Sequence, residues 1–138
     1  MKKFRNWVTF AVVLAMVLSL AVGVSANTRS KPAGIYGTIR GSSYQSTSNI
    51  NLLNTTTNVD KNEDDAYFAI YVEFTNLSGV TSNETRTSYE GATSFNPSFA
   101  IYFTIDTVPS YAFVSHDIRG GTVAPSGYSC YTEAPISI

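Results

Sequence analysis

Tyrosine recurs in this sequence at positions where a strand facing solvent usually carries charge. The segment AYFAIYVEFTN (Ala66–Asn76) has apolar residues at even positions 68 to 74 and Tyr67 and Tyr71 among its odd ones. Successive side chains of a strand point to opposite faces. The even positions therefore predict a face that packs in a core, and the two tyrosines are expected on the outer face.

Two more tyrosines have the same expected placement. SFAIYFTIDT (Ser98–Thr107) repeats the alternation with Tyr102 on its outer face, and Tyr36 is expected outward on the first strand. Tyrosine rings offer a large, rigid contact area with a hydroxyl at the edge, which suits stacking on sugars and contact with proteins. The predicted ligand-binding residues are Tyr36, Tyr67, Tyr71 and Tyr102. Their expected polar neighbours are Thr38, Arg40, Glu73, Thr104 and Asp106.

The alternative is that these tyrosines only stabilise the sheet. Tyrosine is a good strand former, and cross-strand aromatic pairs contribute some tenths of a kcal/mol. A central strand covered on both faces would also bury them. The sequence leaves both alternatives open.

The acidic segment DKNEDD (Asp60–Asp65) is a candidate metal site. Asp60, Asn62 and Asp64 have the one-three-five spacing of a calcium loop, in which alternate oxygens converge on one hard cation. The pattern then departs from the EF-hand, because Asp65 stands where the sharp turn requires glycine. A simpler calcium site using Asp60, Asn62, Asp64 and Asp65 is one hypothesis, and a solvated acidic loop is the other.

His116 and Cys130 are the only histidine and the only cysteine. A hairpin centred on Val123 would place them opposite each other, and a thiol beside an imidazole can act as an activated nucleophile. The sequence supplies no third, orienting group, since consecutive residues in Ser115–Asp117 alternate between faces. We therefore predict no catalytic residues, and a protein that is not an enzyme.

The elements that position these residues are predicted to be strands throughout. β-branched and aromatic residues alternate with frequent glycine, asparagine and serine. Strands are expected over Gly34–Tyr44, Ala66–Asn76, Ser98–Thr107, Tyr111–Ile118 and Tyr128–Glu133, with Val80–Tyr89 as a polar edge strand or a loop. The predicted fold is an all-β antiparallel sandwich of about six to eight strands, with a small closed barrel as the alternative.

The first 26 residues are predicted to be a cleaved signal peptide. Basic residues open the chain, an apolar run of about 17 residues follows at Val8–Val24, and small Ala26 ends the segment. Residues 27–138 are then expected to form one secreted domain, extracellular or associated with the cell surface, with no membrane attachment after cleavage.

Composition narrows the expected partners. Removing Lys2, Lys3 and Arg5 leaves six basic residues against ten acidic ones, a net charge of about −4. With no basic stripe, nucleic acid is not an expected partner, and no cofactor beyond structural calcium is expected. The predicted function is a secreted, non-catalytic module that binds a glycan or a protein surface. The alternative is a structural protein that forms homo-oligomers through lysine-poor strand edges.

Overall fold

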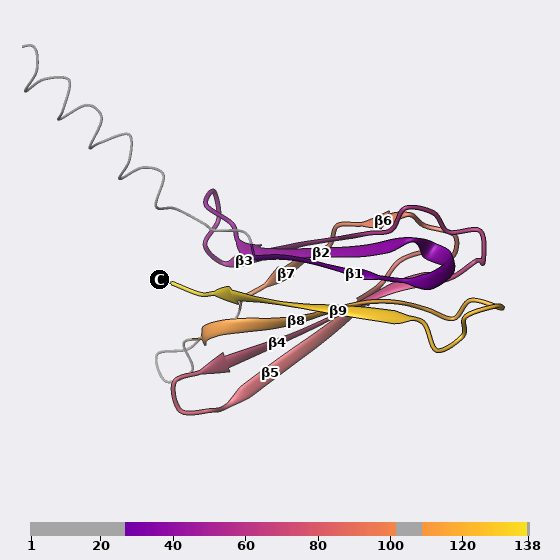
Figure 1. Ribbon diagram of the computed structural model, residues 1–138. Helices are drawn as coiled ribbons and strands as arrows, with labels where there is room; N and C mark the ends of the chain where they lie inside the picture. The colour runs from indigo at the N-terminus through magenta and orange to yellow at the C-terminus, as the bar shows by residue number, and fades with distance from the viewer. Residues whose placement is uncertain (1–26, 102–108, 138) are drawn as a thin grey trace, which may run out of the picture.

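The protein is a sandwich of two antiparallel sheets (Figure 1). The computed structural model describes residues 27–101 and 109–137. The elements in chain order are β1 (Asn27–Pro32), the 3₁₀ turn η1 (Gly34–Tyr36), β2 (Thr38–Gln45), β3 (Leu52–Asn58), β4 (Tyr67–Asn76), β5 (Thr81–Thr87), β6 (Ser94–Phe95), β7 (Ser98–Ala100), β8 (Pro109–Arg119) and β9 (Tyr128–Pro135).

The two sheets are separate, which confirms the predicted sandwich and makes the barrel alternative wrong. Sheet A has the order β1-β2-β3-β6, with β7 also pairing with β3. Sheet B has the order β5-β4-β8-β9. All pairings among the described strands are antiparallel, and the sheets lie as two layers with their inner faces packed together (Figure 1).

β4 has the alternation that the sequence predicts. Its even-numbered residues are buried: Phe68, Ile70, Val72 and Phe74. They divide between two apolar clusters, one near the β4 C-terminal end around Phe74 and Phe99, the other around Phe68 and Ile118. At roughly 25 cal/mol per Å² of apolar area removed from water, this burial is the main stabilising contribution to the sandwich.

The expected strand over Ser98–Thr107 is described only in part. β7 covers Ser98–Ala100, and Phe99 packs across the core in the same cluster as Ile70 of β4. The described part of this segment therefore belongs to sheet A, opposite β4 of sheet B. Tyr102, Thr104 and Asp106 lie outside the described residues.

The N-terminal part of the domain differs from the prediction. The expected strand from Gly34 begins only at Thr38, because Gly34 and Gly37 adopt positive φ of 54° and 80° and turn the chain through η1. β1 was not expected, since its residues NTRSKP contain no apolar alternation. β1 has no buried side chain and is held through its backbone pairing with β2. Val80–Tyr89 was expected as an edge strand or loop, and β5 is that edge strand.

Candidate functional site

The outer face of sheet B carries a group of aromatic side chains, which we call the aromatic face. Tyr67 and Tyr71 lie on this face of β4, as predicted, and both are half-buried. The register brings Tyr71 opposite Ser115 of β8, which in turn lies opposite Tyr131 of β9. Residues directly opposite in antiparallel strands share one face of the sheet. The members of the aromatic face are Tyr67, Tyr71, Tyr111, Phe113 and Tyr131.

Three of these residues were not among the predicted ligand-binding residues. Tyr111 and Tyr131 are 42% and 54% exposed, so large rings are open to solvent. Phe113 and Tyr131 stack, with ring centroids 5.6 Å apart and planes 22° from parallel. The signal was present in the sequence, because the hairpin that sets His116 opposite Cys130 also brings Ser115 opposite Tyr131.

Carboxylates surround the aromatic face. Glu73 and Glu133 lie on the two strands that flank Phe113, each opposite it in register. The Tyr71 hydroxyl donates a hydrogen bond of 2.8 Å to Glu73 Oε2. This bond, together with partial desolvation, raises the pKa of Tyr71. On the same face, the Ser115 hydroxyl donates to Asp117 Oδ1 at 2.6 Å. Flat rings beside hydrogen-bond acceptors can hold a sugar, a peptide or a cationic group.

The expected outward position of Tyr36 is wrong. Tyr36 belongs to η1, its side chain is fully buried, and its hydroxyl donates to Asp64 Oδ2 at 2.9 Å. Desolvation, followed by the contact with Asp64, raises the pKa of Tyr36 to about 12. The expected grouping of Thr38 and Arg40 with the β4 tyrosines is also wrong, because β2 belongs to sheet A.

The acidic loop does not bring its predicted ligands together. Asp60 forms an ion pair of 2.6 Å with Arg40 and accepts the Thr38 backbone N–H at 2.9 Å. The hydrogen bond from Arg40, and then that from Thr38, lowers the pKa of Asp60. The Asn62 amide donates to the carbonyls of Ala66 and Ala92 at 2.7 and 2.8 Å. These side chains tie the loop to its neighbours in the protein.

Asp64 joins the acidic loop to the loop between β8 and β9. Its carboxylate accepts the Thr122 hydroxyl at 2.7 Å, the backbone N–H groups of Val123 and Ala124 at 2.8 and 3.1 Å, and the Tyr36 hydroxyl. Burial acts to raise the pKa of Asp64, but these four hydrogen bonds outweigh it and lower the pKa to about 2.

No assembled calcium ligand set is therefore found among Asp60, Asn62, Asp64 and Asp65. Asp65 is exposed and has a positive φ of 51°, which turns the backbone just before β4. Within the described residues, no group of three or more histidine, cysteine, aspartate or glutamate side chains is placed to hold a metal ion.

His116 and Cys130 are cross-strand neighbours, as predicted, but both are buried. His116 Nδ1 lies 2.7 Å from Thr57 Oγ1, and its Nε2 lies 2.8 Å from Thr132 Oγ1. Thr132 Oγ1 lies 2.7 Å from Ser43 Oγ. Thr57 and Ser43 belong to sheet A, and His116 and Thr132 to sheet B, so this polar layer links the two sheets between the two apolar clusters.

Burial shifts the pKa values of His116 and Cys130 so that both side chains are uncharged at neutral pH. Desolvation lowers the pKa of His116 to about 4, with the nearby charge of Asp117 opposing the shift. Desolvation, and then the Asp117 charge, raises the pKa of the Cys130 thiol to about 11. A neutral imidazole bonded to two hydroxyls and a protonated thiol do not make the thiolate that nucleophilic attack needs.

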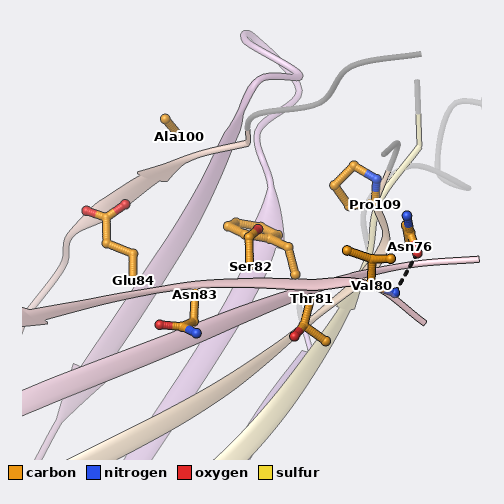
Figure 2. A pocket seen from close by; sticks show the side chains of 9 residues that line it. Asn76, Val80, Thr81, Ser82, Asn83, Glu84, Ala100 and Pro109 are labelled. Carbon is orange, nitrogen blue, oxygen red and sulfur yellow. Dashed lines mark hydrogen bonds between the residues drawn. The ribbon is translucent and has the colours of Figure 1, made fainter. Parts of the chain in front are cut away.

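A hollow of about 350 Å³ lies between the start of β5 and the segments of the same chain that contain Ala100 and Pro109 (Figure 2). Figure 2 shows Ser82 and Glu84 of β5 on the side toward Ala100, and Asn83 on the opposite side of the strand. Among the described lining residues Glu84 alone has a carboxylate, and that group forms an ion pair of 2.8 Å with Arg86. Ala100 and Pro109 stand close to residues 102–108 in sequence, which lie outside the described part, and we assign no site to this hollow.

Compared with protein-family models, curated proteins and solved structures, the chain gives no significant match. Across residues 27–101 and 109–137, no helix is long and apolar enough to cross a membrane.

Proposed function

We propose that this protein is an exported, non-catalytic binding domain, and that the aromatic face of sheet B is the surface with which it contacts a glycan or a protein. The observation that carries this proposal is that exposed Tyr131 stacks on half-buried Phe113, with Tyr111 also open to solvent on the same face. Rings that served only to stabilise the sheet would not need to be this exposed.

The chemistry around the rings supports a binding role. The faces of aromatic rings stack on the C–H faces of sugars and on peptide groups, and their edges and hydroxyls fix orientation. Glu73 and Glu133 lie on the strands next to that of Phe113, and their carboxylates can accept hydrogen bonds from sugar hydroxyls or backbone N–H groups. Strands hold these groups more rigidly than loops would, which lowers the entropy lost on binding.

A non-catalytic role is supported by the positions of the most reactive side chains. His116 is fully buried and Cys130 is 4% exposed. Neither lies on the aromatic face, because both point into the sandwich with the other even-numbered residues of β8 and β9.

Thermal shift against a panel of glycans, with and without calcium, tests this proposal. A ligand at about 100 times its Kd adds about 2.7 kcal/mol, which raises the Tm of a domain of this size by several degrees. We expect the shift to be lost in Tyr131→Ala and Tyr71→Ala and kept in Tyr89→Ala, which removes a tyrosine that is 77% exposed elsewhere. A shift that survives both substitutions would place binding away from this face, and a shift with calcium alone would revive the metal hypothesis for the acidic loop.

Self-association through strand edges is a second candidate, favoured by β5. This strand is an edge of sheet B, and its residues are exposed except for half-buried Glu84. Its two charged side chains, Glu84 and Arg86, form an ion pair with each other and so do little to repel an incoming strand. A mass that rises with protein concentration, and is reduced by Thr85→Pro, would support edge pairing.

A further inference from the structure

The charge on the aromatic face has one predominant sign. Glu73, Asp117 and Glu133 lie on it, and Arg119 stands at its far end opposite Tyr67. The ion pairs found in the described residues are Arg40 with Asp60 and Arg86 with Glu84, so none of the three carboxylates is neutralised by a salt bridge there.

The middle of the face has a regular arrangement of carboxylate, ring and carboxylate. Glu73 and Glu133 lie on the strands either side of Phe113, in register with it. Neighbouring strands are about 4.8 Å apart, so a cation beside Phe113 would be near both carboxylates and next to the stacked rings of Phe113 and Tyr131. This row therefore favours a positively charged contact over a neutral one.

The same chain carries an exposed basic strand. Arg29 and Lys31 are two residues apart on β1, so they point to one side, and both are exposed. Neither forms an ion pair within the described part of the chain. β1 is an edge of sheet A, and all its residues after half-buried Asn27 are exposed, although its backbone borders β9 of the same copy, where Cys130 Sγ lies 4.0 Å from the Arg29 carbonyl oxygen.

We propose that the aromatic face of one copy binds strand β1 of a second copy, with Arg29 and Lys31 reaching Glu73 and Glu133 around Phe113. This inference rests on the proposed function and names the partner of that same surface. The contact is heterologous, because the face and β1 are different surfaces of each copy. A symmetric face-to-face dimer is disfavoured, since it would set the glutamates of both copies against one another.

The strength of the contact depends on ionic strength. Exposed charges more than a Debye length apart are screened, and that length falls from about 30 Å at 0.01 M salt to about 8 Å at 0.15 M. Because each copy has both surfaces, a filled face leaves a free face at the other end of the pair. Association is therefore expected to continue beyond two copies as the protein concentration rises.

Sedimentation velocity over a range of protein concentrations, at about 20 mM and about 300 mM salt, measures this association. The native protein should grow from one copy to several at low salt and return toward one copy at high salt. The face variant Glu73→Lys/Glu133→Lys and the strand variant Arg29→Glu/Lys31→Glu should each remain single copies. The control Glu63→Lys/Glu90→Lys changes the net charge as the face variant does, at two exposed glutamates elsewhere, and should associate as the native protein does.

Mixing the two variants gives the decisive result. The basic face of one then meets the acidic strand of the other, and the two unaltered surfaces also match, so an equimolar mixture should regain association. Circular dichroism and Tm establish that each variant is folded before the comparison. A native protein that stays a single copy at low salt, a mixture that does not recover, or a control that loses association as fully as the face variant would overturn the proposal.

The outcome for this inference is distinguishable from that for the binding function. If the native protein stays a single copy while a glycan shift still requires Tyr131, the second copy is wrong as partner and the binding face stands. If a basic peptide such as oligolysine binds the face of such a single copy, the partner is another protein. If association occurs and is unaffected by both the face variant and Tyr131→Ala, the second copy is wrong as the partner of this face, and the glycan shift alone then decides whether the face binds.

Discussion

The buried imidazole of His116 should make the stability of this protein fall as the pH drops below neutrality. The unfolded chain binds a proton at this residue with a pKa near 6.5, whereas the folded pKa is about 4. Between these values the unfolded state holds more protons than the native state, so the free energy of unfolding decreases as pH falls through the window.

The size of the effect follows from the pKa difference. One pKa unit corresponds to about 1.36 kcal/mol, so lowering the pH from 7 to 4 should remove about 3 kcal/mol through this residue. The structural reason is that the His116 ring is bonded to two hydroxyls, those of Thr57 and Thr132, and to no carboxylate that would balance a positive charge. Asp117 is adjacent in sequence but lies on the opposite face of β8.

Urea unfolding at several pH values between 7 and 4, for the native protein and for His116→Gln, measures this contribution. Aspartates and glutamates titrate alike in both proteins, so their effects cancel in the difference. The native protein should lose about 3 kcal/mol more than the variant over this range.

Nuclear magnetic resonance gives a second readout that needs no variant. His116 is the only histidine, so its ring C–H signals are unambiguous. They should not shift between pH 7 and pH 5.5. Parallel stability curves for the native protein and the variant, or a ring that titrates near pH 6.5, would refute the reasoning.

Three further predictions follow from buried contacts. Asp64→Asn should lower the Tm at pH 7, with Asp65→Asn as the control. The difference in Tm from the native protein should narrow as pH falls from about 4 to about 2, because the native protein then protonates Asp64 and loses the same contribution. A Tm difference that stays constant over this pH range would argue against this. Gly41→Ala should destabilise the fold by about 1–3 kcal/mol in urea unfolding, because a Cβ there would lie 2.5 Å from the His116 ring. Gly79→Ala is the comparison, because its site is open but its φ is positive. A larger loss of unfolding free energy in Gly79→Ala than in Gly41→Ala would show that backbone strain outweighs packing. Cys130 should react slowly with a thiol reagent at pH 8 when folded and rapidly in urea, because its pKa is about 11; rapid labelling of the folded protein would contradict its burial.

The sequence predicted those elements in which one face is strictly apolar. β4 could be predicted because its alternation allows only one assignment of faces, and the hairpin of β8 and β9, expected around Val123, correctly placed His116 opposite Cys130. β1 could not be predicted, because it has no buried side chain and depends on backbone pairing with β2.

The candidate site was predicted only in part for similar reasons. Tyr67 and Tyr71 were placed on the correct face, whereas the positive φ angles of Gly34 and Gly37 removed Tyr36 from the strand and buried it. The partners of Asp64 lie 28 to 60 residues away along the chain. Contacts this distant depend on the tertiary fold, and no local spacing in DKNEDD indicates them.

The polar layer also bears on the order in which the sandwich assembles. Ser43 and Thr132 are 89 residues apart, and Thr57 and His116 are 59 apart. The hydrogen bonds of the layer form only after four strands from both sheets are in place. A partly assembled chain that excludes water from this region leaves ring nitrogens and hydroxyls unpaired, at about 1–3 kcal/mol for each group. Half-built and misaligned sandwiches are thereby disfavoured, and folding gains cooperativity from the least apolar part of its core.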